Sequence, residues 1–326
     1  MNEAQSTGAY AVLFPGQGSQ AVGMGMALAE AFPEAAEVLR RADRVVPGLL
    51  RLIEQGPEAQ LRQTAYTQPA LLAVCVATWE VWRRRVGPAG PAAGAGHSLG
   101  EYSALVAAGA LGLEEGVALV RARGQAMAEA LPAGEGGMGA VLGLEDEQVV
   151  AICREVAREL GDEAAVVAAN FNAPGQVVVS GRTAALGAVR ARVQRAGGRW
   201  ADLAVSGPFH SPLMAGAARR LREALREVRW QAPAWPVIAN VDARPYPERA
   251  DAIGPALEAQ LVSPVRWAES LRTMAAMGVT HFVELGPGRV LSGTVRRTLP
   301  GAVALNVQDP ASLEASLARL KGDGLI

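Results

Sequence analysis

The segment Gly96-His97-Ser98-Leu99-Gly100 constrains the fold more than any other part of this chain. The small residues at 91–95 before it suit a buried strand, and residues 101–106 after it suit a helix. Ser98 is therefore expected at a sharp turn from strand to helix, where the flanking glycines avoid a clash that a Cβ atom would cause. Such a turn presents the hydroxyl beside unpaired helix N–H groups that stabilise an oxyanion. The pattern predicts a nucleophilic serine.

Short apolar runs alternate with helical stretches along most of the chain. This order predicts an α/β fold with a mostly parallel sheet and helices on both of its faces. One long helix is expected from Pro69 to Arg85, with Pro69 in its first turn. The expected strands are residues 10–14, 92–96, 235–241, 280–285 and 302–307.

The composition is that of a globular protein and excludes several classes of partner. The chain has 326 residues, of which 50% are hydrophobic and 19% charged, and its formal net charge is −1. These values predict no nucleic-acid partner and no membrane partner. No apolar run approaches the roughly 18 residues of a membrane span, and residues 1–7 lack the order of a signal peptide. Cys75 and Cys153 are not expected to form a disulfide, which favours a cytoplasmic protein.

Residues 134–205 depart from the α/β alternation. Strands are expected at 138–144, 164–170, 176–180 and 199–205, with helices at 145–160 and 183–196. The order βαββαβ is that of a ferredoxin-like unit. Glycine-rich residues 134–137 and the segment 206–208 have the composition of linkers. We therefore predict one large domain, residues 1–133 and 206–326, into which a small subdomain of residues 134–205 is inserted.

A serine nucleophile needs a general base, and the sequence contains three histidines. His97 is next to Ser98, so its side chain is expected to point away from the partner of the serine hydroxyl. His281 opens an expected strand, which favours a structural role. His210 lies where the small subdomain returns to the large domain, and a histidine in such a loop can reach a cleft. The alternative for His210 is a surface histidine before the helix expected from 212 to 228.

Arg123 borders the inward-facing stripe of the helix expected from 114 to 131. A buried guanidinium needs an anion or several acceptors, because an unpaired charge is costly in a low dielectric. Two alternatives follow for its partner. One is a structural carboxylate such as Glu101 or Glu284, and the other is a substrate carboxylate held by two parallel hydrogen bonds.

The loop Phe14-Pro15-Gly16-Gln17-Gly18-Ser19-Gln20 follows the first expected strand and is rich in glycine. It lacks both the Gly-x-Gly-x-x-Gly register and the lysine of phosphate-binding loops, so it does not predict a nucleotide site. A loop in this position can place a backbone N–H beside the serine as half of an oxyanion hole. No His, Cys or carboxylate cluster has metal-ligand spacing, and neither a metal nor another cofactor is expected.

Together these motifs resemble the malonyl-CoA:acyl carrier protein transacylases of fatty acid synthesis, in the same order and over nearly the whole chain. The resemblance implies a hydrolase-like large domain with a ferredoxin-like insertion. It also implies malonyl-CoA and the phosphopantetheine arm of acyl carrier protein as partners, and a monomer is expected. The segments that carry the resemblance are Phe14 to Gln20, Gly96 to Leu105, Arg123-Gly124, Asn170 to Val177, Gly207 to His210 and Val283 to Gly288.

Roles follow from the resemblance at the positions that match its motifs. Ser98 is implied as the residue that accepts the acyl group, and His210 as the general base and acid. Arg123 is implied to hold the malonyl carboxylate, while the backbone N–H groups of Gln17 and Leu99 form the oxyanion hole.

Two further positions belong to this implied site. In the family a main-chain carbonyl, not a carboxylate, orients the histidine, and the segment 257–265 matches that place with Gln260 as the corresponding residue. Phe209, next to His210, is expected to narrow the acyl pocket beside the malonyl α-carbon.

The implied reaction is an acyl exchange in two steps through a malonyl-serine ester. One alternative is a serine esterase or thioesterase that hydrolyses a small acyl thioester with the same residues. A second is a transacylase that serves polyketide synthesis, and a third is a carrier-binding module without catalysis. An inward arginine in the acyl pocket favours a small acidic acyl group over a long lipid.

Overall fold

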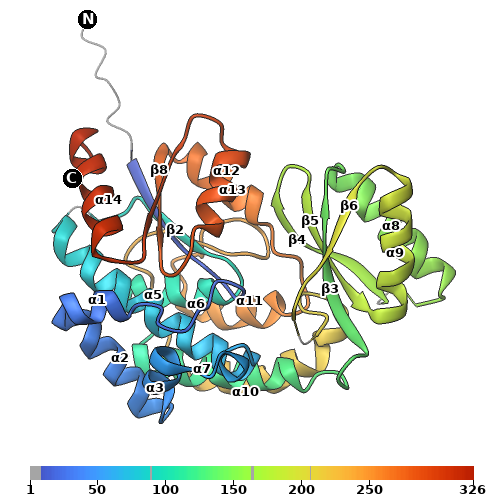
Figure 1. Ribbon diagram of the computed structural model, residues 1–326, viewed down its shortest axis with the longest axis horizontal. Coiled ribbons are helices and arrows are strands. Elements are labelled where there is room, and N and C mark those ends of the chain that lie inside the picture. The colour runs from blue at the N-terminus through green and yellow to red at the C-terminus, as the bar shows by residue number, and fades with distance from the viewer. Residues whose placement is uncertain (1–8, 89, 163–164, 206) are drawn as a thin grey trace, which may run out of the picture.

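The computed structural model describes residues 9–88, 90–162, 165–205 and 207–326. Within these residues the larger unit contains a five-stranded sheet in the order β7-β2-β1-β8-β9, and every pairing in it is parallel (Figure 1). The five strands correspond to the five that the sequence predicts for this domain. They are β1 (Ala9–Phe14), β2 (Ala93–Gly96), β7 (Val237–Ile238), β8 (Val279–Leu285) and β9 (Val303–Val307).

Helices cover both faces of this sheet, as expected. The side chains of Val12 and Phe14 pack in one apolar core with α5 and α6, whereas Ala11 and Leu13 pack in another with α12 and α13. Because alternate side chains of a strand point to opposite faces, β1 is buried on both and is a continuous apolar run. The helices of this unit are α1 (Met26–Ala31), α2 (Pro33–Val45), α3 (Leu49–Gln55), α4 (Glu58–Leu61), α5 (Thr64–Val86), α6 (Leu99–Ala107), α7 (Leu113–Ala128), α10 (Ala215–Glu227), α11 (Ile253–Gln260), α12 (Trp267–Ala276), α13 (Val290–Thr298) and α14 (Pro310–Gly322), with 3-10 turns at Pro212–Met214 and Ala250–Ala252.

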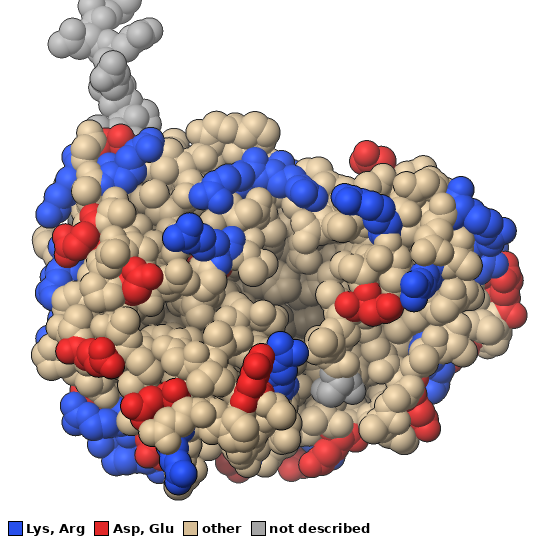
Figure 2. All heavy atoms as spheres, viewed as in Figure 1, with Lys and Arg blue, Asp and Glu red and all other residues tan. Residues whose placement is uncertain are grey.

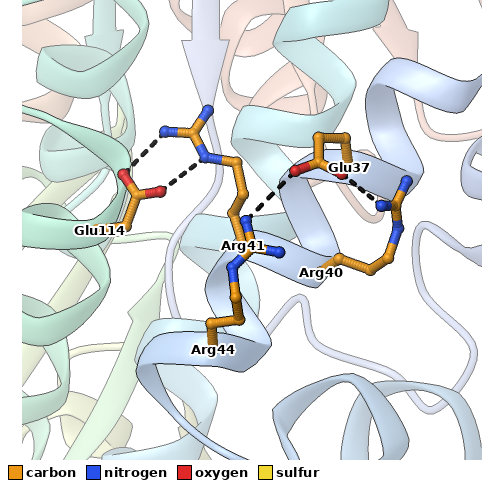
Figure 3. A network of polar contacts seen from close by, with 5 residues as sticks. All are labelled: Glu37, Arg40, Arg41, Arg44 and Glu114. Carbon is orange, nitrogen blue, oxygen red and sulfur yellow. Dashed lines mark hydrogen bonds and ion pairs between the residues drawn. The ribbon is translucent and has the colours of Figure 1, made fainter.

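Ion pairs link the outer helix α2 to α7, the helix that carries Arg123. Arg41 donates to both carboxylate oxygens of Glu114, at 2.7 and 2.8 Å, while Glu37 accepts from Arg40 and Arg44 on its own helix (Figure 3). These side chains are largely exposed, and exposed pairs contribute roughly 0.2 to 1 kcal/mol each. The network therefore adds little to the stability of the fold.

The smaller unit has the predicted βαββαβ order and an antiparallel sheet, β4-β5-β3-β6. Helices α8 and α9 cover one face of this sheet (Figure 1), and valines of the sheet and of both helices form a separate apolar core between them. The elements are β3 (Gly136–Leu142), α8 (Asp146–Glu159), β4 (Val166–Ala173), β5 (Gln176–Arg182), α9 (Thr183–Arg195) and β6 (Arg199–Asp202). The exact limits of the subdomain, 134 and 205, stay a prediction, and Ser206, Ala164 and residues 1–7 lie outside the described residues.

The predicted position of Pro69 is wrong. Helix α5 begins at Thr64, so Pro69 lies inside the helix and not in its first turn. A proline at this position leaves the carbonyl of the residue four places earlier, Ala65, without its helical donor. Arg121 of α7 supplies that donor, since its Nη1 lies 2.5 Å from the Ala65 oxygen. A contact with a distant helix therefore allows the proline.

Other predicted boundaries differ by a few residues. The strand expected at 235–241 is only Val237–Ile238, because Pro236 has no N–H to donate and the chain turns at Ala243, where φ is 57°. Strand β4 continues through Phe171 to Ala173, so the turn to β5 is confined to Pro174 and Gly175. β6 ends three residues earlier than expected, at Asp202.

Two observations concern membrane spans and disulfides. Among the described residues no helix is long and apolar enough to cross a membrane. The thiols of Cys75 and Cys153 are both buried and free, and burial raises the pKa of the Cys153 thiol to about 12. These cysteines do not form a disulfide with each other.

Candidate active site

Ser98 occupies a strained turn between β2 and α6. Its φ and ψ are 51° and −105°, a conformation that residues with side chains rarely adopt. A Cβ atom on Gly96 would lie 1.8 Å from the carbonyl carbon of Gly100, and one on Gly100 would lie 2.0 Å from the carbonyl oxygen of Phe14. Both glycines are therefore required for the chain to make this turn beside β1.

Asn240, just after β7, fastens the turn from the neighbouring strand. Its Oδ1 accepts a hydrogen bond from the Ser98 N–H at 2.7 Å, and its Nδ2 donates to the Gly96 carbonyl at 2.8 Å. Both ends of the amide are therefore used to hold the segment that carries the serine. Asn240 is not among the residues predicted for the site, and its place at the carboxyl end of an expected strand is the one sequence signal that points to it.

The structure brings His210 against Ser98. The Nε2 of His210 lies 2.7 Å from the Ser98 Oγ, and its Nδ1 lies 3.0 Å from the main-chain oxygen of Gln260. A hydrogen on Nδ1, donated to that carbonyl, leaves Nε2 free to accept the serine proton. Burial, and secondarily the charge of Arg123, lower the pKa of His210 to about 3. The imidazole is therefore neutral at physiological pH, and its Nε2 carries a lone pair that can accept the serine proton.

Arg123 lies directly behind the serine and is 1% exposed. Its Nη2 donates to the Ser98 Oγ at 3.1 Å and to the Gln260 Oε1 at 2.9 Å, and its Nη1 donates to the Gln68 Oε1 at 2.9 Å. The Tyr102 ring centroid is 5.3 Å from the guanidinium carbon, and Nε has no hydrogen-bond acceptor among the described residues. The guanidinium is thus held by neutral groups and has an unused donor.

Neither of the two carboxylates expected as structural partners, Glu101 and Glu284, pairs with Arg123 within the described residues. Glu284 instead accepts from the N–H groups of Leu291 and Ser292 at the start of α13, at 3.1 and 2.8 Å. Glu101 accepts from the Gln260 amide at 2.6 Å. Gln68, which accepts from Arg123, is not among the residues predicted for the site. Its sequence signal is that it is a polar residue directly before the apolar run at 69–77.

Of the two residues expected to form the oxyanion hole, Leu99 follows Ser98 directly and Gln17 lines the same cavity as Ser98. Leu99 is the first residue of α6, and Gln17 follows β1 in the loop that lines the cavity. Neither backbone N–H has an acceptor in the described part of the chain, which leaves both donors available to a ligand. The Gln17 side chain turns away and donates to the Thr64 hydroxyl at 3.3 Å.

A cavity of about 280 Å³ opens in front of these groups, between the two units. The large unit contributes Ser98, His210 and Phe209 to its lining, and Figure 2 shows that the molecule is hollowed between its two units. Arg123 lies behind this lining, in contact with the serine oxygen. The small unit adds a wall of five apolar residues and three polar ones, which are Met138, Ala140, Val178, Leu203, Val205, Asn170, Asn172 and Gln176.

The other two histidines have different surroundings. His97 also lines the cavity, but its Nε2 lies 2.8 Å from the Oδ1 of Asn172 in β4, and its ring contacts Trp267 edge-on. It therefore faces the small unit and not the partner of Ser98. His281 contacts Thr280 at 2.8 Å and Asp323 at 2.7 Å. These contacts anchor the C-terminal segment to β8.

Comparison with known proteins assigns the family. Residues 12–323 match the acyl transferase domain family. The malonyl CoA-acyl carrier protein transacylase of Salmonella typhimurium is 43% identical over 313 residues, which cover 95% of this chain and 99% of that protein.

Solved structures agree over the same length. The malonyl CoA-acyl carrier protein transacylase of Coxiella burnetii is 39% identical with a TM-score of 0.92, covering 96% of this chain and 98% of its own. A malonyl-transacylase solved in complex with its type II polyketide acyl-carrier protein is 42% identical with a TM-score of 0.91, covering 95% and 99%. The chain therefore belongs to the malonyl-CoA:acyl carrier protein transacylase family.

Proposed function

We propose that this enzyme transfers the malonyl group of malonyl-CoA to the phosphopantetheine thiol of acyl carrier protein, through an ester on Ser98, and so supplies fatty acid elongation. The observation that carries the proposal is the contact of the Ser98 Oγ with both His210, at 2.7 Å, and Arg123, at 3.1 Å. A nucleophile with a base on one side and a buried cation on the other suits an acyl group that ends in a carboxylate. The names of the relatives and the solved carrier complex support both partners.

The first half of the reaction acylates the enzyme. His210 Nε2 takes the hydroxyl proton as the Ser98 oxygen attacks the thioester carbonyl carbon. The N–H groups of Gln17 and Leu99 stabilise the oxyanion. The carbon–sulfur bond then breaks, and the leaving thiolate of CoA takes the proton from His210. A malonyl-serine ester remains.

The second half reverses these steps with another thiol. The phosphopantetheine thiol gives its proton to His210 as its sulfur attacks the ester carbonyl. The Ser98 oxygen leaves and regains the proton from the imidazolium. CoA and the carrier arm use one cavity and therefore bind alternately, and the apolar residues of its wall limit access of water while the ester waits.

Arg123 and Phe209 select the acyl group in this proposal. The guanidinium holds the malonyl carboxylate with parallel hydrogen bonds, for which the planar arginine fork is suited and a lysine ammonium is not. Phe209 is 6% exposed and lines the cavity next to His210, where it limits the size of a substituent on the α-carbon.

Replacement of Arg123 by alanine tests this function. The change removes charge-assisted hydrogen bonds worth roughly 1.5 to 3 kcal/mol each, so malonyl transfer should fall by orders of magnitude. Transfer of a neutral acetyl group should fall much less, and Arg123→Lys should rescue malonyl transfer poorly. Initial rates with malonyl-CoA and acetyl-CoA, with the melting temperature of the same preparation, measure the effect. A parallel loss of both activities with stability would assign Arg123 a packing role only.

A labelling experiment separates transfer from hydrolysis. The protein is mixed with labelled malonyl-CoA without carrier and stopped with acid. A stable malonyl ester on the Ser98 peptide supports transfer, whereas immediate release of free malonate supports a thioesterase.

We also infer that the enzyme works in the cytoplasm as a monomer. The free buried thiols of Cys75 and Cys153 support a reducing compartment. Sedimentation at increasing protein concentration tests the oligomeric state.

A further inference from the structure

A buried polar chain runs from the guanidinium of Arg123 to the carboxyl group of Glu101. Arg123 Nη2 donates to the Gln260 Oε1 at 2.9 Å, and the Gln260 Nε2 donates to the Glu101 Oε2 at 2.6 Å. All three side chains are at most 1% exposed. The one amide of Gln260 therefore separates a buried cation from a buried carboxyl group.

The surroundings allow this amide a single orientation. Besides the bond to Glu101, the Gln260 Nε2 donates to the main-chain oxygen of Ser98 at 3.0 Å. A flipped amide would point its NH₂ at the guanidinium and its oxygen at the carboxyl group, and both contacts would be repulsive. Glu101 thus fixes the side chain of Gln260, whose main-chain oxygen also orients His210.

The groups around Glu101 favour its ionised form. The Tyr246 hydroxyl donates to the Oε1 of Glu101, and the Asn240 N–H donates to its Oε2 at 3.2 Å. Together with the bond from Gln260, the carboxyl group accepts three hydrogen bonds. Such donors stabilise a carboxylate. Burial nevertheless raises the pKa of Glu101 to about 7, so that an alkaline pH favours its ionised form.

We propose that Glu101 is a positioning residue that balances the charge of Arg123 through the amide of Gln260, and thereby leaves the guanidinium available to the malonyl carboxylate. The inference rests on the function proposed above. A carboxylate in direct contact would occupy the guanidinium hydrogens that the substrate needs. With no carboxylate nearby, the buried cation would lack a counter-charge. When the Gln260 amide separates the carboxylate from the guanidinium, the charge of Arg123 is balanced and its hydrogens stay free for the substrate.

Moving the negative charge from position 101 to position 260 tests this proposal. The double variant Glu101→Gln with Gln260→Glu places the carboxylate against Arg123 and keeps a donor–acceptor contact between positions 101 and 260. The measured quantity is the ratio of kcat/KM for malonyl-CoA to kcat/KM for acetyl-CoA at pH 8, with carrier protein as acceptor. The exchange should lower this ratio at least tenfold, because Arg123 is then already paired.

The single variant Glu101→Gln moves the ratio the other way. Its amide oxygen still accepts from Gln260, but the counter-charge is gone, so the ratio should rise. Free malonate should also inhibit this variant several-fold more strongly than wild type. Glu284→Gln, which neutralises another fully buried carboxylate without contact to Arg123, is the matched control and should leave the ratio unchanged.

The outcomes separate this inference from the proposed function. If Arg123→Ala lowers the ratio but the charge exchange does not, the role of Glu101 is wrong and the role of Arg123 stands. If Arg123→Ala leaves the ratio unchanged, the carboxylate-binding role of Arg123 is wrong. A purely structural Glu101 would lower both rates in parallel in each variant. Should the double variant fail to fold, malonate inhibition of Glu101→Gln decides, and inhibition equal to or weaker than that of wild type overturns the inference.

Discussion

Ser98 and His210 are 112 positions apart in the chain and 2.7 Å apart in the structure. Each is held by the main chain in an uncommon conformation, with φ of 51° and 58°. Such strained backbone conformations persist only where the surrounding structure holds them in place. The reactive pair is therefore preorganised before substrate binds.

A pair that works as a unit predicts non-additive loss of activity. Ser98→Ala and His210→Ala should each remove most malonyl transfer, and the double variant should be little worse than either. Single-turnover rates with labelled malonyl-CoA measure this. Losses that multiply strictly in the double variant would show that the two residues act separately. A remaining rate above background is expected from the oxyanion donors.

The buried neutral imidazole predicts how stability depends on pH. The pKa of His210 falls from 6.5 to about 3 on folding, so the unfolded chain binds an extra proton between these values. His210 therefore does not reduce the free energy of unfolding above pH 6.5. As the pH falls from 6.5 towards 3, His210 lowers the free energy of unfolding by up to about 1.4 kcal/mol per pH unit. Urea unfolding at pH 7, 6 and 5 should show wild type losing stability relative to His210→Gln. Parallel pH dependence of the two proteins would contradict this.

At the scale of elements, the turn from β2 to α6 depends on close backbone contact. Gly100→Ala would place a Cβ 2.0 Å from the main-chain oxygen of Phe14. The atoms nearest to this Cβ all belong to the backbone, which cannot move aside as the end of a side chain could. A loss of about 3 kcal/mol or more in the free energy of unfolding is expected. Gly216→Ala in α10 is the matched control, since no atom of a distant described residue lies within 4 Å of its added Cβ. It should stabilise by about 0.5 to 1 kcal/mol, and equal effects in urea unfolding would refute the steric argument.

At the scale of the molecule, the cavity needs both units. Backbone hydrogen bonds join β4 to the large unit, from the Phe171 N–H to the Val265 oxygen at 2.9 Å and from the Val265 N–H to the Ala169 oxygen at 2.8 Å. The His97–Asn172 contact lies beside them. The small unit is thus fastened next to the serine and forms the wall opposite it.

Loosening that wall should admit water. Asn172→Ala removes the partner of His97 and one polar lining residue, so a larger share of the malonyl ester should be hydrolysed, by a few-fold. The measurement is free malonate released against malonyl-carrier formed, in wild type and variant. An unchanged partition in a folded variant would show that this contact does not restrict water.

By itself the sequence determined the class of the fold, the five parallel strands, the βαββαβ order and the turn at Ser98. These follow from local patterns, because apolar periodicity and glycines act over a few neighbouring residues. The tertiary structure decided the contacts of the site. Gln68 and Gln260 are 55 and 137 positions from the Arg123 that they contact.

The same limit explains the predictions that were wrong or incomplete. Pro69 is tolerated inside α5 because Arg121, 56 positions away from Ala65, supplies the donor that the proline removes. Arg123 was expected to meet a carboxylate if its role were structural, but Gln260 stands between it and Glu101. Which polar group satisfies which is set by packing between distant elements, since burial makes each unpaired group costly. Local periodicity carries no information about those pairings.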